Sequence, residues 1–151
     1  MKRARAGIAV LVLAWTLSGC VGHGVRPAPE HEPQDWPGFW KSFQTAAAAH
    51  DRTALRPLMA SKFDYTFGDG AATPENAFAF WDRSEIGGWR ALAEVAKEGA
   101  VDYVPPPQWE LKGKVRLAPP QAAAPGYRQW RAVFAQQADG EWKFTAFLQG
   151  D

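Results

Sequence analysis

Asp64, Tyr65 and Asp69 are the side chains of this sequence best suited to acid–base chemistry, and they lie close together in the chain. A carboxyl group held in an apolar pocket has its pKa raised towards neutrality, where it can give and take a proton. Residues 62–67 alternate between apolar and polar types, as in a half-buried strand. This alternation places Tyr65 on the buried side and predicts that Asp64 faces away from it. All three are candidate catalytic residues.

Aromatic side chains are the second group that could form a site. A ligand pocket is lined mainly by apolar and aromatic side chains with a few polar groups. The same rings could instead pack as an ordinary core, and the sequence leaves both interpretations open. The candidate ligand-binding residues are Trp40, Phe43, Tyr65, Trp81, Trp130 and Arg131.

Other kinds of site find little support in the sequence. It contains no nucleophile elbow, zinc-protease helix or phosphate-binding loop. We interpret His50 as a helix-ending residue and Asp51 as a helix cap. Residues 64–75 begin and end like a calcium-binding loop, but Thr66 and Gly68 stand where oxygen ligands are needed. We therefore expect no metal site and no cofactor.

The predicted elements place helices before strands. Apolar residues at helical spacing, with Asp, Thr or Pro at their starts, predict the helices. Two-residue alternation predicts the strands. This order predicts an α+β domain in which N-terminal helices pack on one face of a curved antiparallel sheet. The predicted helices are 36–49, 52–59, 74–81 and 84–98, and the predicted strands are 62–67, 109–117, 129–136 and 141–148.

Composition indicates a globular protein. The chain has 151 residues, of which 46% are apolar and 13% aromatic, and its net charge is +1. A dedicated nucleic-acid binder would show a clustered basic excess, so we expect no nucleic-acid partner. Without residues 1–19, 14 of the 17 basic side chains remain against 16 acidic ones. The remaining 132 residues suffice for one domain.

The N-terminus has the layout of an export signal. Lys2, Arg3 and Arg5 precede an apolar run over residues 7–17, which is too short to span a membrane. The following Leu-Ser-Gly-Cys, ending at Cys20, resembles the lipobox of bacterial lipoproteins. That resemblance implies a signal peptide over 1–19 and acylation of Cys20, whereas the alternative is a plain secretory signal.

Anchoring follows from this resemblance. Lipoproteins carry several acyl chains, and two chains hold a protein stably on a membrane. Val21 stands where inner-membrane lipoproteins of enteric bacteria often have Asp, so the resemblance implies the outer membrane, facing the periplasm. Residues 20–35 contain three prolines and no apolar periodicity, which predicts a flexible linker. Cys20 is the single cysteine, which excludes an internal disulfide.

The body of the chain resembles the NTF2-like, or SnoaL-like, superfamily. The resemblance lies in Phe39-Trp40 through His50-Asp51, in residues 127–134 and in the ending Gly-Glu-Trp-Lys-Phe-Thr-Ala-Phe-Leu-Gln-Gly-Asp over 140–151. It implies one domain over 36–151, folded as a cone with an apolar pocket between sheet and helices. Members include isomerases, cyclases and dehydratases as well as binding and dimerisation modules.

Two functions are compatible with this resemblance. The first is a module that binds a small apolar ligand or a protein partner, with a homodimer as one form. The second is a SnoaL-like enzyme, of isomerase, dehydratase or hydrolase type, that uses a pocket carboxylate. Enzymes of the superfamily often pair an Asp with a His, and only His50 could supply that partner here. Because a fold does not assign a reaction, binding is the preferred hypothesis.

The lipid anchor is tested by replacing its acylation site. In Cys20→Ser the thiol that would carry the acyl group is absent, so the protein is expected to leave the membrane fraction and to mature abnormally. Fractionation and the mass of the mature chain measure both effects. A variant that stays with membranes and matures normally would show that the anchor hypothesis is wrong.

Overall fold

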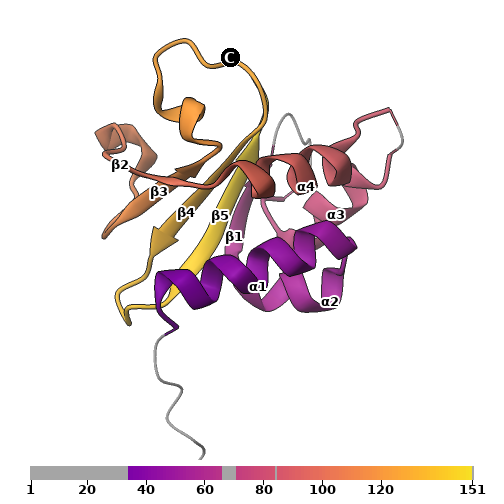
Figure 1. Cartoon of the computed structure of the whole chain (residues 1–151), viewed down its shortest axis with the longest axis horizontal. Coiled ribbons are helices and arrows are strands. Elements are labelled where there is room, and N and C mark those ends of the chain that lie inside the picture. Colours follow the sequence, from indigo (N-terminus) through magenta and orange to yellow (C-terminus); the bar gives the residue numbers. More distant parts are fainter. Residues whose placement is uncertain (1–33, 66–70, 84, 151) are drawn as a thin grey trace, which may run out of the picture. The chain divides into compact units, whose positions relative to one another are not determined.

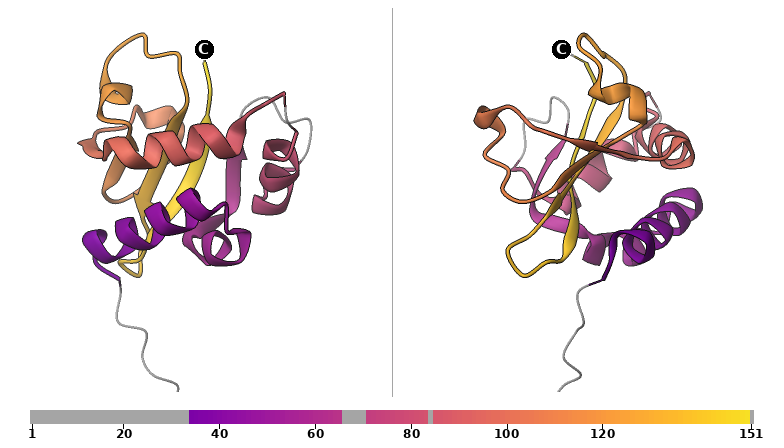
Figure 2. Two further views of the ribbon diagram at one scale, coloured as in Figure 1. Left: turned by 45° about the vertical axis from the view of Figure 1, so that its right-hand side comes forward. Right: turned by 60° about the vertical axis from the view of Figure 1, so that its left-hand side comes forward.

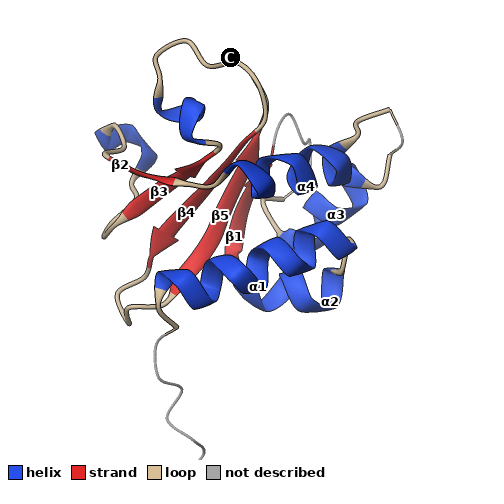
Figure 3. Ribbon diagram, in the orientation of Figure 1, coloured by secondary structure: helices blue, strands red, loops and turns tan. Residues whose placement is uncertain are grey.

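A computed structural model describes residues 34–65, 71–83 and 85–150 of the chain. These residues form an α+β fold in which α-helices cover one face of a curved five-stranded sheet (Figures 1 and 3). The chain divides into two units, 1–31 and 32–151, and the described residues belong to the second. The export signal, Cys20 and Asp69 lie outside the described residues. Within the described ranges no helix is both long and apolar enough to cross a membrane.

Helix α1 (Trp36–Ala49) begins and ends as its sequence predicts. The Asp35 side chain accepts a hydrogen bond of 2.9 Å from the Gly38 amide and so caps the free N–H groups of the first turn. Pro37 lies in that turn, where its missing N–H costs nothing. His50 adopts a left-handed conformation with φ of 52° and ends the helix.

Helix α2 (Arg52–Leu55) follows directly and is short. The Asp51 carboxylate accepts a hydrogen bond of 2.9 Å from the Ala54 amide. The chain then continues as the 3₁₀ helix η1 (Arg56–Leu58), which contains Pro57. The interpretation of Asp51 as a helix cap is therefore confirmed.

Helices α3 (Pro74–Trp81) and α4 (Gly88–Glu98) follow the first strand. Helix α4 starts later than predicted, because Gly87 has a φ of +63° and cannot belong to a right-handed helix. At Gly88 an added Cβ would lie 2.6 Å from the Trp81 ring, so only glycine allows the two helices to approach here.

The sheet has the strand order β1-β5-β4-β3-β2. Strands β2 to β5 pair in antiparallel fashion, but β1 runs parallel to β5, so the prediction of a purely antiparallel sheet is wrong. Parallel pairing needs a long connection, and here α3, α4 and three strands separate the two. The strands are β1 (Met59–Tyr65), β2 (Val101–Tyr103), β3 (Val115–Ala118), β4 (Arg131–Gln136) and β5 (Trp142–Leu148).

The predicted strand 109–117 is shorter than expected. Only its end forms β3, while the preceding residues include the 3₁₀ helix η2 (Pro107–Trp109). Gly113 explains the break: its φ is +80°, and a Cβ there would lie 2.5 Å from the Gln136 carbonyl oxygen. Strand β2 was not predicted because its three residues are too few to show alternation.

Strand β5 changes face part-way along its length. Val133 pairs with Ala146 and Phe134 with Phe144, so β5 has one extra residue, Thr145, at this point. Such a bulge shifts the alternation by one residue. Phe144 faces the helices, whereas Ala146 faces the opposite side. Strict alternation over the predicted strand 141–148 places residues 142, 144, 146 and 148 on one face, and this expectation is wrong beyond the bulge.

The core between sheet and helices is built largely from aromatic rings. Phe134 meets Phe43 edge-on at 4.9 Å between ring centroids, and Phe144 meets Phe43 at the same distance. Figure 2 shows α1 and α4 against this side of the sheet. Six phenylalanines of this core are fully buried: Phe39, Phe43, Phe63, Phe134, Phe144 and Phe147.

The contact between α3 and α4 yields a stability prediction. Gly88→Ala places a methyl group against the Trp81 ring and is expected to lower the free energy of unfolding by about 1–3 kcal/mol. Urea denaturation measures the change. Glu94→Ala, on the exposed side of the same helix, is the control and should alter it by no more than about 0.5 kcal/mol. Equal effects in both variants would show that the two helices do not meet at Gly88.

Candidate functional site

A groove of about 520 Å³ lies on the sheet face opposite the helices. Strand β1 forms one side and the connection between β2 and β3 forms the other, while β4 and β5 form the floor. Its volume falls in the range of small-molecule sites. The lining residues are Ala60, Ser61, Lys62, Asp64, Gln108, Trp109, Glu110, Leu111, Val133, Gln137, Thr145, Ala146 and Leu148.

The groove exists because β1 separates from β5 along part of its length. Met59 pairs with Phe144 and Asp64 pairs with Ala146. Between these two pairs the chain advances by five residues in β1 but by only two residues in β5. The extra residues of β1 form a bulge of several residues that interrupts the pairing with β5. On its other side β1 is held by the Phe63 amide, which donates a 2.9 Å hydrogen bond to the Ala72 carbonyl.

Apolar side chains form part of the floor and part of one wall of the groove. Val133 and Ala146 are buried parts of a second apolar cluster, on the opposite face from the aromatic core. Trp109 and Leu111 are partly buried against this cluster. An apolar ligand would therefore remove further hydrocarbon surface from water, which is favourable by roughly 25 cal/mol per Å².

The rim of the groove carries charges of both signs. Lys62 and Asp64 are exposed on β1, and Glu110 is exposed on the connection across the groove. Among the described residues none of these three side chains has a hydrogen bond or ion pair. They are free to contact a ligand, whereas Val133 and Ala146 in the floor present apolar side chains.

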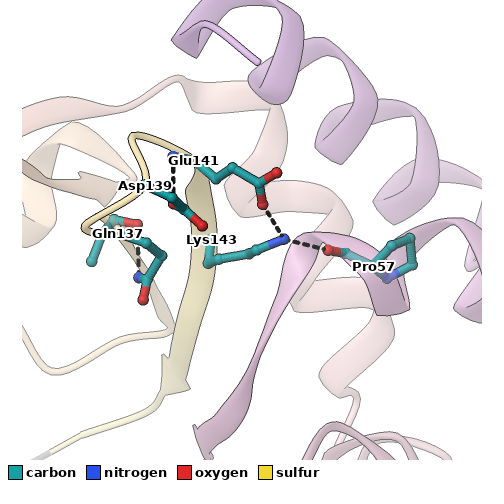
Figure 4. Close-up of polar contacts among 6 residues, drawn as sticks. Pro57, Gln137, Asp139, Glu141 and Lys143 are labelled. Atoms are coloured by element: carbon teal, nitrogen blue, oxygen red, sulfur yellow. Dashed lines mark hydrogen bonds and ion pairs between the residues drawn. The ribbon is translucent and has the colours of Figure 1, made fainter. Parts of the chain in front are cut away.

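Polar contacts fix the β4–β5 hairpin, which contributes Gln137 to the groove (Figure 4). Lys143 Nζ donates a 3.1 Å hydrogen bond to the Pro57 carbonyl and pairs with Glu141 at 2.9 Å. These contacts join the β4–β5 hairpin to η1. Gln137, in the same hairpin, lines the groove, so the contacts hold one of its walls in place.

The structure places the predicted ligand-binding rings on the helix side of the sheet. Phe43 and Trp81 are buried in the aromatic core. Trp40, Tyr65 and Trp130 are partly buried and pack against that core. The five rings come together by packing, and none of them lines the groove. Their role as ligand contacts stays a prediction.

Asp64 and Tyr65, the candidate catalytic residues that the structure describes, lie on opposite faces of the sheet. Asp64 lines the groove, on the side away from the aromatic core, as the alternation of its strand predicts. Tyr65 points to the other face, where its ring lies 5.5 Å from that of Phe80. Arg131 lines a separate cavity. Among the described residues no group of three or more His, Cys, Asp or Glu side chains could hold a metal ion.

Sequence reasoning missed several residues of the groove. Alternation over the predicted strand 109–117 places Trp109, Leu111 and Val115 on one face, which is confirmed, but only Val115 lies in a strand. No sequence pattern indicated that Lys62 or Gln137 would line a site. The groove depends on the bulge in β1 and on the course of the β2–β3 connection, which local patterns do not specify.

Comparison with known proteins finds similarity in solved structures alone. No family model matches the chain, and no curated protein matches it. The chain is similar to the crystal structure of a candidate ketosteroid isomerase from Shewanella frigidimarina NCIMB 400. The sequence identity is 14% and the TM-score 0.36, over 73% of this chain and 89% of that one. A similarity at this level does not bear on ligand or reaction, which we argue from the residues alone.

Proposed function

We propose that this protein is a lipid-anchored protein of the cell envelope whose single domain binds a small apolar ligand in the groove. The observation that carries the proposal is the groove itself, which has an apolar floor and a polar rim on the open face of the sheet. The helix face offers less room, because the described rings there pack closely against one another. A ligand of mixed character would cover the floor and contact Lys62 or Asp64.

We assign the domain over 36–151 to the NTF2-like superfamily. The order of two helices, a strand, two further helices and the remaining strands supports this assignment, as does the curved sheet with helices on one face. The resemblance implies a pocket between sheet and helices. We place the ligand on the opposite face instead, because Phe43, Phe134 and Phe144 are fully buried on the helix side.

We further propose that Cys20 carries the lipid and that residues 20–35 link it to the domain. The first helix of the domain then begins directly after the linker, where Asp35 caps α1. A short tether would keep the groove near the membrane surface, where apolar and amphiphilic molecules are concentrated. The outer membrane, facing the periplasm, is the location we propose.

The groove hypothesis is tested by filling the groove with a side chain. Ser61 is exposed on its rim, so Ser61→Trp occupies the space without disturbing the core. Binding of N-phenyl-1-naphthylamine, a neutral fluorescent probe, is expected to weaken by about tenfold or more. The full chain with Cys20→Ser avoids lipid and detergent, into which the probe would partition.

The matched control is Thr53→Trp, which adds the same ring at an exposed position of α2. This variant should bind the probe as the parent chain does. If Ser61→Trp and Thr53→Trp bind the probe equally well, or if the parent chain does not bind it, the groove is not the ligand site.

A carboxylate enzyme is the second candidate function, and the position of Asp64 favours it. This carboxylate lines the groove and has no side-chain partner among the described residues, so it can reach a bound substrate. An Asp64→Asn strain is expected to reproduce the phenotype of the full deletion if Asp64 is catalytic. A strain with normal growth and normal protein level, where the deletion has a defect, would remove Asp64 as a catalyst.

A further inference from the structure

A second cavity of about 520 Å³ lies on the same apolar cluster as the groove, towards the connection between β3 and β4. Its walls are Tyr103, Trp109 and Tyr127, with Arg128 and Arg131. The residues before β4 form one side and the β2–β3 connection forms the other. Both cavities reach Trp109, but only the second is lined by arginines.

The charges that line this cavity have one sign. Arg128 and Arg131 line it, and no carboxylate does so among the described residues. Arg128 is exposed and forms no ion pair with another described residue. Arg131 is half-buried, and its Nη1 donates a hydrogen bond of 3.4 Å to the Tyr127 carbonyl, which holds the guanidinium near the cavity wall. The groove differs from this cavity, because its lining includes Lys62 together with the carboxylates of Asp64 and Glu110.

The acidic side chain that acts on Tyr127 lies outside the lining of this cavity. Glu98 accepts a 3.2 Å hydrogen bond from Gln121 and does not line the cavity. Burial raises the pKa of Tyr127, and Glu98 raises it further while Arg131 lowers it. The phenol therefore stays neutral at physiological pH and donates a 3.0 Å hydrogen bond to the Trp130 carbonyl.

Aromatic rings provide the apolar part of the cavity. The Tyr103 and Trp109 rings lie 5.7 Å apart between centroids with an angle of 40° between their planes. Both residues line the cavity, so the flat ring of a ligand could pack in offset or edge contact against either of them. A planar apolar body with one negative group would match both features of the cavity.

We propose that this cavity binds a small aromatic carboxylate. The carboxylate would pair with Arg128, because a guanidinium presents two parallel N–H donors to two carboxylate oxygens. The aromatic ring would pack against Tyr103 and Trp109. This site is separate from the groove and does not depend on the function proposed for it.

Calorimetric titration with three probes tests the proposal on the full chain carrying Cys20→Ser. The probes are 2-naphthoate, its neutral counterpart 2-naphthalenemethanol, and acetate. We expect 2-naphthoate to bind about tenfold more tightly than the alcohol, and acetate to bind more weakly still. Added salt should weaken binding of the two carboxylates, naphthoate and acetate, but not of the neutral alcohol. Equal affinity for naphthoate and alcohol would overturn the proposal.

Variants then locate the site. Arg128→Gln is expected to weaken naphthoate binding by about tenfold, whereas Arg90→Gln, an exposed arginine of α4, should leave it unchanged. Tyr103→Leu should weaken binding and Tyr103→Phe should retain it, which separates the ring from the hydroxyl. Asp64→Asn should have no effect, because Asp64 lines only the groove. Unchanged binding in Arg128→Gln and Tyr103→Leu together would overturn the proposal.

Discussion

The contact of Phe43 with Phe134 and Phe144 is the interaction on which the rest of the fold depends. Phe43 comes from the first helix, and the other two rings come from the last two strands, so this contact joins the two ends of the described chain. All three side chains are fully buried. Edge-to-face pairs add about 0.5–1.5 kcal/mol beyond the area they bury. Because rings fill this layer, the space for a ligand has to be found elsewhere.

The bulge at Thr145 determines which side chains of β5 face the aromatic core and which face the groove. Thr145 Oγ1 donates a 3.1 Å hydrogen bond to the Val133 carbonyl, which stabilises the irregular pairing. Before the bulge β5 supplies Phe144 to the aromatic core, and after it the strand supplies Ala146 to the opposite face. Because the Ala146 side chain is small, it leaves space above the apolar part of the groove floor. The same strand thus contributes to the core and to the groove.

The two cavities of the open face differ in charge, although they share one tryptophan. The groove has a lysine and two carboxylates at its rim, whereas the second cavity has two arginines and no carboxylate among the described residues. Charge selects between ligands more strongly than it adds affinity. The two cavities therefore offer a ligand different charged groups, although Gln108 and Trp109 line both.

Local patterns determined the helices, their caps and the aromatic character of the core. Asp35, Asp51 and Gly99 act within one or two turns, so their effects can be predicted from neighbouring residues. Alternation also predicted that Asp64 faces away from the core. Only tertiary structure decided that β1 runs parallel to β5 and that β5 bulges at Thr145. Pairing between distant strands depends on the whole sheet, and one extra residue reverses every later side chain. The groove and the arginine-lined cavity follow from such long-range choices, and no local pattern specifies them.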